Sequence, residues 1–189
     1  HFPWIGMRTA MLDGAHVEYF RGITTPIGIK IGQGMDSEWL QELRGVLNPS
    51  NEAGRITLIH RLGAGNVESH LPRLIEAVQA TGSPVLWVCD PMHGNTESTE
   101  AGYKTRRFDN IVSEIEASFR VHQAQGTYLG GVHLELTGDN VTECTGGAQA
   151  ITDDKLGDRY HTACAPRLTA RQALELAFLL AERLTRPRA

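Results

Sequence analysis

Four short apolar runs constrain the fold of this chain more than any other feature of its sequence. They occupy residues 26–32, 56–62, 84–90 and 130–137. Each run is rich in β-branched or aliphatic side chains and does not alternate strictly with polar residues. This pattern is typical of parallel strands that are covered on both faces, so we predict four buried strands.

Helical patterns lie between and after these runs. Asp36 is the expected N-cap of the first helix, Gly82 the expected C-terminal cap of the second, and Thr169 with Gln172 forms a capping-box signature for the last. The expected apolar stripes are Trp39, Leu40, Leu43 and Leu47; Leu71, Leu74, Ile75 and Val78; Phe108, Ile111, Val112, Ile115 and Phe119; and Leu174, Ala177, Phe178 and Ala181.

The alternation of strand and helix predicts an α/β fold built from right-handed βαβ units. Four such units do not close a (β/α)₈ barrel, which needs eight strands, whereas an open doubly wound sheet is complete with four. The pattern alone leaves both architectures open. Two polar loops, residues 94–104 and 138–166, are long enough to be functional or disordered.

Composition argues against several classes of protein. The formal net charge of −4 is spread over 189 residues, so nothing indicates a nucleic-acid-binding stripe or a polybasic membrane anchor. No apolar run approaches the roughly 20 residues of a membrane span. Three cysteines are too few for a disulfide framework, so we expect a cytoplasmic protein. Because the chain does not begin with Met, we also expect it to be a piece of a longer polypeptide.

Residues that are costly to bury stand at or just after the ends of the predicted strands. They are Lys30 for the first strand, Arg61 for the second, Asp90 and His93 for the third, and Glu135 for the fourth. The carboxyl ends of parallel strands meet at one edge of a sheet or barrel, where α/β enzymes build their sites. The sequence therefore predicts one site formed by these side chains.

The chemistry of these side chains indicates the kind of ligand. Lys30 and Arg61, with Arg8 upstream, are cations that can hold a phosphate or a carboxylate. His93 and Glu135 offer a nitrogen and an oxygen ligand for a divalent metal such as Mn, Fe, Co or Zn. Cations beside a metal indicate a phosphorylated, anionic substrate and a carbonyl group to be polarised.

Each of these residues also has a simpler interpretation. A strand-end Lys or Arg is more often a solvated charge or a surface ion-pair member, and a single His is more often structural than a ligand. His133 lies two residues before Glu135, shares a strand face with it, and is a rival metal ligand. Cys89 is expected to be an inert core residue, and the glycine-rich residues 145–147 are too generic for a phosphate loop.

Longer strings around these residues carry a family resemblance. They are WIGMRT at 4–9, LDGAH at 12–16, PIGIKIG at 26–32, RITLIHRLG at 55–63, DPMHGNT at 90–96, KTR at 104–106, GGVHLE at 130–135, VTEC at 141–144, PRL at 166–168 and QALE at 172–175. In this order they resemble the class II (plant-type) 3-deoxy-D-arabino-heptulosonate 7-phosphate (DAHP) synthases. The resemblance implies a (β/α)₈ TIM barrel, of which residues 1–189 are the C-terminal half, roughly its last four βα units, with the N-terminal half absent.

The resemblance also implies roles for individual residues. Arg8, Lys30 and Arg61 match the family's phosphoenolpyruvate-binding cations. His93 and Glu135 match two of its four ligands to a divalent metal such as Mn²⁺ or Co²⁺. Lys30, His93 and Glu135 are accordingly the expected catalytic residues.

The implied reaction joins two phosphorylated substrates. C3 of phosphoenolpyruvate adds to the aldehyde of erythrose 4-phosphate, and water then attacks C2 and releases phosphate, which begins the shikimate route to aromatic compounds. Lys104 and Arg106 lie in the segment expected to bind the aldose phosphate. The expected assembly is a homo-oligomer that also contains the missing half of the barrel, and no nucleic acid or membrane partner is expected.

The chain departs from the family pattern at two positions of the site. The family's fourth metal ligand is an Asp in a CDPRL string, where this chain has Ala165, and its WIGERT string has a Glu where this chain has Met7. A methyl group cannot coordinate a metal. The resemblance therefore leaves two alternatives to the synthase, a non-catalytic homologue and an enzyme that acts on a different aldehyde in specialised metabolism.

Overall fold

The computed structural model describes residues 1–185, which belong to two compact units. The first unit comprises His1–Gly94 and Glu114–His133. The second comprises Asn95–Ser113 and the segment that begins at Leu134. Each unit is described by itself below.

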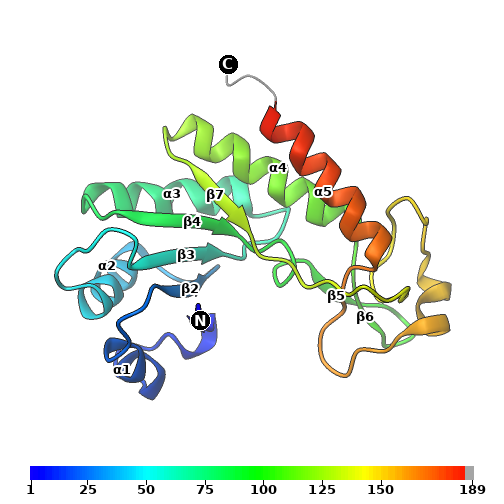
Figure 1. Ribbon diagram of the computed structural model, residues 1–189, viewed down its shortest axis with the longest axis horizontal. Helices are drawn as coiled ribbons and strands as arrows, with labels where there is room; N and C mark the ends of the chain where they lie inside the picture. The colour runs from blue at the N-terminus through cyan, green and yellow to red at the C-terminus, as the bar shows by residue number, and fades with distance from the viewer. Residues whose placement is uncertain (186–189) are drawn as a thin grey trace. The chain divides into compact units, whose positions relative to one another are not determined.

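The first unit contains a five-stranded, entirely parallel sheet in the order β1-β2-β3-β4-β7 (Figure 1). The strands are β1 (Trp4–Ile5), β2 (Ile27–Ile31), β3 (Ile56–His60), β4 (Val85–Cys89) and β7 (Leu129–Val132). Three of the predicted strands thus lie within one to two residues of β2, β3 and β4. The α/β fold with a parallel sheet is confirmed.

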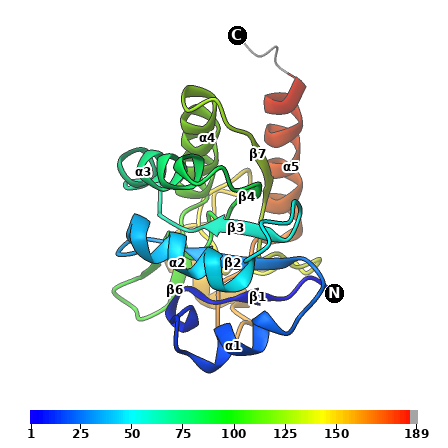
Figure 2. The ribbon, with the colours of Figure 1, turned by 90° about the vertical axis from the view of Figure 1, so that its left-hand side faces the viewer.

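Helices separate the strands in the chain and follow the same order along the sheet (Figure 2). They are η1 (Met7–Thr9), α1 (Ala15–Arg21), α2 (Ser37–Leu47), α3 (Val67–Ala80) and, from Glu114 onward, the main part of α4 (Phe108–Ala124). The stripes predicted for α2 and α3 are buried, except that Trp39 is half-buried. In α4, Phe108, Ile111 and Ile115 are buried, whereas Val112 and Phe119 are half-buried.

The two faces of the sheet carry different side chains. Ile29 and Leu58 are cross-strand partners and line a small apolar cavity together with side chains of α2 and α3. Successive side chains of a strand point to opposite faces, so Lys30, with its cross-strand neighbours Ile59 and Val88, belongs to the face opposite these helices. The predicted site residue Lys30 is therefore on the face that α2 and α3 do not cover.

The predicted helix caps are confirmed in their geometry. The Asp36 carboxylate accepts a hydrogen bond from the Trp39 N–H at 2.8 Å, which satisfies one of the open amides at the start of α2. Gly82 follows α3 with a φ of +63°, a conformation that side chains with a Cβ rarely adopt. The backbone N–H of Thr169 donates to the Gln172 side chain at 3.2 Å, as in a capping box.

The second unit contains less regular structure. A hairpin is formed by β5 (Thr96–Ser98) and β6 (Lys104–Arg106), followed by the 3₁₀ helix η2 (Asp153–Arg159) and the helix α5 (Ala170–Thr185). The two stretches predicted as long loops therefore contain a hairpin and a short helix.

Two strand predictions need correction. The last predicted strand, residues 130–137, is too long, because β7 ends at Val132 and Leu136 forms an isolated bridge with Leu168 instead. Glu135 therefore lies beyond the strand rather than within it. The sequence also gave no sign of β1, which has only two residues and so no periodicity to detect.

The predicted apolar stripe of α5 is wrong as a statement about burial. Its members are exposed: Leu174, Ala177, Phe178 and Ala181. Leu174 and Phe178 are 59% and 67% exposed, and the buried helix residues are Gln172 and Leu176. Periodicity identifies the apolar side of a helix, but it does not tell what covers that side.

Among the described residues, no helix is both long and apolar enough to cross a membrane.

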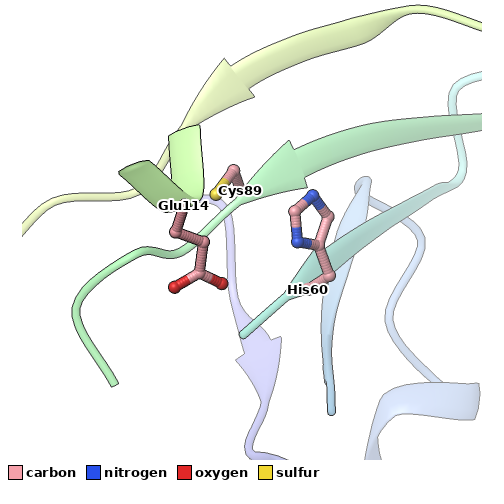
Figure 3. Close-up of side chains that lie close together, drawn as sticks. All are labelled: His60, Cys89 and Glu114. Carbon is pink, nitrogen blue, oxygen red and sulfur yellow. The ribbon is translucent and has the colours of Figure 1, made fainter. Parts of the chain in front are cut away.

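A layer of buried polar side chains lies between the sheet and α4. His60 of β3 and Cys89 of β4 are cross-strand partners, and Glu114, Ser118 and His122 follow one another at intervals of four along α4. All five are at most 1% exposed. Figure 3 shows that the side chains of His60, Cys89 and Glu114 lie close together. Only the apolar stripe of this helix is predicted from the sequence, although the spacing of four between Glu114, Ser118 and His122 also marks a polar stripe.

Burial controls the protonation of this layer. The two ring nitrogens of His60 and the Nε2 atom of His122 are buried without a hydrogen-bond partner. Burial, with the neighbouring His122, lowers the pKa of His60 from 6.5 to about 3, and burial lowers that of His122 to about 4. Burial also raises the pKa of the Cys89 thiol well above its usual value, as expected for an inert core cysteine.

The buried histidines predict a specific pH dependence of stability. In the unfolded chain His60 takes up a proton near pH 6.5, but in the folded protein it stays neutral down to about pH 3. Its contribution to stability is therefore complete above pH 6.5 and is lost as the pH falls toward 3. We expect His60→Leu to reduce the loss of unfolding free energy between about pH 7 and about pH 5 by about 2 kcal/mol.

Denaturant unfolding at both pH values measures this difference. His16→Gln is the matched control, because His16 is exposed on α1. The same pH dependence in wild type and His60→Leu would show that His60 is not held neutral.

Candidate functional site

In the first unit, the carboxylate of Asp90 connects a cation to an imidazole. Asp90 directly follows β4 and is fully buried, and its Oδ2 atom pairs with the Lys30 ammonium and lies 2.8 Å from the His93 Nδ1 atom. Its Oδ1 atom accepts hydrogen bonds from the backbone N–H groups of Met92 and His93 at 3.0 and 3.2 Å. Asp90 therefore fixes both the turn after β4 and the two side chains.

The electrostatics keep Asp90 ionised. Burial alone would raise its pKa, but the hydrogen bond from His93 and the charge of Lys30 bring the pKa well below its usual value. Lys30 is only 5% exposed, so the two opposite charges are buried together. Removing one partner would leave an uncompensated charge in the protein interior.

The hydrogen bond to Asp90 also determines the tautomer of His93. A neutral imidazole that donates from Nδ1 carries its lone pair on Nε2. Metal-binding histidines are commonly oriented by a carboxylate that accepts from the other ring nitrogen. Since the His93 side chain is 33% exposed, its geometry suits a metal ligand at the edge of the sheet.

Trp4 contacts both Lys30 and the rival ligand His133. The Lys30 Nζ atom lies 5.9 Å from the centre of the Trp4 ring, within the range of a cation–π interaction. The His133 ring meets the Trp4 ring edge-on with centroids 5.2 Å apart. The backbone N–H of His133 donates to the Cys89 carbonyl at 2.8 Å, which fixes the chain just after β7.

Arg61 directly follows β3 and contacts the turn that carries His93. Its Nη2 atom donates to the His93 carbonyl at 2.6 Å, and its Nη1 atom lies 3.6 Å from the Met7 Sδ atom. A Cβ at Gly32 would lie 2.5 Å from this sulfur, so the position has no room for a side chain while Met7 is there. Arg8, next to Met7, is exposed on η1.

Three residues of the buried polar layer are close enough together to hold a metal ion. His60, Cys89 and Glu114 each offer one ligand atom, and these atoms lie within 4.8 Å of one another (Figure 3). Nitrogen, sulfur and oxygen ligands of this kind suit zinc and related metals. This group was not predicted from the sequence, and it shares no residue with the predicted ligands His93 and Glu135.

In the second unit, Arg106 holds the carboxylate of Glu135. Arg106 is 1% exposed, and its Nη1 atom donates to the Glu135 Oε2 atom at 2.6 Å and to the Pro166 carbonyl. Its Nε atom donates to the Thr96 hydroxyl at 3.0 Å. Ala165 directly precedes Pro166, whose carbonyl Arg106 binds. An Asp at position 165, as in the CDPRL string, would therefore stand next to that residue in the chain.

Glu143 organises the chain around Ala165. Its buried carboxylate accepts from the Arg167 Nη2 and Nε atoms at 2.6 and 3.0 Å, and from the backbone N–H groups of Arg167 and His161 at 2.8 and 3.2 Å. Burial alone would raise the pKa of Glu143, but the hydrogen bonds and charge of Arg167 lower it. Glu143 is part of the VTEC string at 141–144, but no role is predicted for it from the sequence.

Lys104 lies on the exposed side of the hairpin. It pairs with Ser98 in the β5–β6 register, and its carbonyl accepts a hydrogen bond from the Tyr160 hydroxyl at 2.7 Å. The neighbouring Thr105 is buried and donates to the Glu143 carbonyl at 2.9 Å. The side chain of Lys104 is therefore presented by a well-anchored backbone.

The structure thus groups the predicted site residues in two sets. Lys30, Arg61 and His93 are connected within the first unit, with Arg8 on the adjoining η1. Lys104, Arg106 and Glu135 belong to the second unit. Because His93 and Glu135 belong to different units, their pairing at one metal stays a prediction.

Comparison with known proteins relates these groups to a family. The model of the class-II DAHP synthetase family matches residues 1–181. The chain is 55% identical over 184 residues to the phospho-2-dehydro-3-deoxyheptonate aldolase AroG of Mycolicibacterium smegmatis, a match that covers 97% of this chain and 40% of that protein.

A fungal protein gives a similar match. The chain is 52% identical over 184 residues to the phospho-2-dehydro-3-deoxyheptonate aldolase of Neurospora crassa, which covers 96% of this chain and 38% of that protein. The chain therefore spans about two fifths of the length of these two relatives. From the match over residues 1–181, with these identities, we conclude that the chain belongs to the class-II DAHP synthetase family.

Proposed function

We propose that the protein to which this chain belongs condenses phosphoenolpyruvate with erythrose 4-phosphate, giving DAHP and phosphate at the start of the shikimate pathway. The observation that carries the proposal is the shared carboxylate of Asp90, which holds a cation, Lys30, and a potential metal ligand, His93, at one edge of the sheet. Arg61 adds a second cation to the same turn. The names of the two relatives, phospho-2-dehydro-3-deoxyheptonate aldolases, agree with this reaction.

The proposed architecture is a (β/α)₈ barrel in which residues 1–189 form the C-terminal half. The five-stranded sheet has the parallel order of a barrel segment, and its edge strands are β1 and β7. The relatives are more than twice as long as the matched segment, which leaves room for further strands. The exposed apolar stripe of α5 is then covered by other parts of the complete protein.

The cations serve the two anionic substrates. Lys30 and Arg61, together with Arg8, bind the phosphate and carboxylate of phosphoenolpyruvate, and their positive charges neutralise these two anionic groups. Lys104 binds the phosphate of the aldose from the exposed side of the hairpin. Arg106 belongs to the same segment, where its contacts position Glu135 for the reaction.

The donor set fits a divalent metal such as Mn²⁺ or Co²⁺, with His93 and Glu135 as ligands. The hydrogen bond from His93 Nδ1 to Asp90 orients the imidazole as in carboxylate–histidine–metal sites, and Glu135 supplies a carboxylate oxygen. A bound metal supplies Lewis-acid polarisation of the aldehyde. Ala165 offers no ligand atom, so this chain contributes one ligand fewer than its family pattern.

Location and assembly are further parts of the proposal. Cys89, Cys144 and Cys164 are all free thiols in the described structure, which agrees with a reducing cytoplasm. A homo-oligomer of the complete protein is expected from the family resemblance alone.

One prediction of the proposed function concerns activity. We expect the complete protein, supplied with Mn²⁺ or Co²⁺, to consume phosphoenolpyruvate only when erythrose 4-phosphate is present, and to lose this activity with a chelator. Loss of phosphoenolpyruvate absorbance and release of inorganic phosphate follow the reaction. We expect Ala165→Asp to raise metal affinity, since it restores a carboxylate beside Pro166.

Inactivity would discriminate between the remaining alternatives. Folded but inactive protein that Ala165→Asp makes active would place the defect at the metal site. Inactivity in both forms would contradict the synthase and favour the non-catalytic homologue. Consumption of phosphoenolpyruvate with another aldehyde, but not with erythrose 4-phosphate, would favour the enzyme of specialised metabolism.

A further prediction separates the two candidate histidine ligands. We expect His93→Ala to abolish tight metal binding and His133→Ala to leave it unchanged, because Asp90 orients only His93. We expect Asp90→Asn to lower metal affinity by about 10- to 100-fold, as for other carboxylates that orient a ligand. Metal titration by isothermal calorimetry on the complete protein measures all three; stronger loss from His133→Ala would reverse the assignment.

A further inference from the structure

We propose that Glu114 is a positioning residue, a buried carboxylate that sets the place of Arg61 and thereby the affinity for phosphoenolpyruvate. This inference rests on the proposed function, because it concerns the cation that binds that substrate. Glu114 is on α4, distant in sequence from the segment after β3 that carries Arg61. It acts through the backbone of that segment.

The contacts of Glu114 are directed at two consecutive peptide groups. Its Oε1 atom accepts hydrogen bonds from the backbone N–H groups of Leu62 and Gly63, both at 3.0 Å. Glu114 is fully buried, so water does not compete for these two hydrogen bonds. The two N–H groups belong to the residues immediately after Arg61.

The opposite side of the same segment is held as well. The Leu62 carbonyl accepts from the Gln33 and Asn66 side chains at 3.0 and 3.4 Å, and the Arg61 N–H donates to the Ile31 carbonyl at 2.9 Å. Gly63 has a φ of +87°, so the chain turns sharply at the residue whose N–H donates to Glu114. The backbone at Arg61 therefore has little freedom while Glu114 is in place.

The turn with His93 packs directly on this anchored segment. A Cβ at Gly94 would overlap the backbone of Gly63, so the two turns touch without intervening side chains. The guanidinium of Arg61 donates to the His93 carbonyl at 2.6 Å. A displacement of Leu62 and Gly63 would therefore move the neighbouring Arg61. It would also move His93, through the Gly63–Gly94 packing and the Arg61–His93 hydrogen bond.

The test compares substitutions that keep, move or remove the acceptor. Glu114→Gln keeps an oxygen at the same reach, Glu114→Asp withdraws the carboxylate by one methylene, and Glu114→Met removes the acceptor at similar volume. Ser118→Ala is the matched control. Ser118 is buried one turn further along α4 and donates to the Glu114 carbonyl and toward Cys89, but not to the segment after β3.

The variants are made in the complete protein, and the KM for each substrate and the calorimetric Kd for phosphoenolpyruvate are measured. We expect Glu114→Asp to raise both constants for phosphoenolpyruvate about tenfold, with the KM for erythrose 4-phosphate changed less than about twofold. Glu114→Gln should stay within about threefold of wild type, since its amide oxygen still accepts both bonds. We expect Glu114→Met to raise the KM and Kd for phosphoenolpyruvate more than Glu114→Asp does. If Glu114→Met does not fold, the result for Glu114→Asp alone tests the inference.

Hydrogen exchange at the Leu62 and Gly63 amides checks the mechanism. Exchange should accelerate in Glu114→Asp and remain slow in Ser118→Ala. The inference is overturned if wild type binds phosphoenolpyruvate but Glu114→Asp weakens that binding no more than Ser118→Ala, or weakens both substrates equally. If wild type binds no phosphoenolpyruvate, the proposed function fails and the inference with it, which is a different result.

Discussion

The buried ion pair between Lys30 and Asp90 is the constraint on which the first unit's site depends. An isolated charge in this interior would be strongly unfavourable, so each partner requires the other. Once Asp90 is held ionised in this place, its second role follows, because its two oxygens also fix the turn after β4 and the ring of His93. One carboxylate thereby gives a cation and a potential metal ligand a common position. Such pre-organisation favours a site that must hold charged substrates in a defined geometry.

The two faces of the sheet carry different polar residues: one face carries Lys30 of the candidate site, and the other carries the buried polar layer. Lys30 belongs to the face opposite α2 and α3, whereas His60 and Cys89 meet α4 in the buried polar layer. The two sets are nevertheless joined at the strand ends. Glu114 holds the segment after β3, and Asp90 holds the turn after β4. The placement of Arg61 and His93 is therefore a property of both layers, and a change in the buried layer can reach the site without touching a substrate.

Much of this organisation follows from local sequence, and some of it does not. The runs around β2, β3 and β4 and the cap at Asp36 were predicted because strand composition and capping act over a few residues. The fourth strand was predicted too long, since composition does not reveal that Leu136 pairs with Leu168. The apolar stripe of α5 is predicted to be buried but is exposed, because periodicity does not reveal what covers the apolar side of a helix. For the site, strand-end position singled out Lys30, Arg61, Asp90 and His93. It did not reveal Glu114, which holds the segment after Arg61, because Glu114 lies 52 residues from Leu62.

The departure at Ala165 changes the charge balance of the second unit rather than its framework. Glu143 holds Arg167 and His161 through hydrogen bonds that involve no atom of residue 165, so the chain there keeps its shape without the carboxylate. Arg106 already neutralises Glu135, and no second carboxylate from residue 165 restores a negative charge beside it. A divalent cation is attracted less strongly to such a neutral pair than to two carboxylates. In the proposed metal site, the orientation of His93 by Asp90 then carries a larger share of the affinity, which gives the Lys30–Asp90 pair more influence over metal binding in this chain.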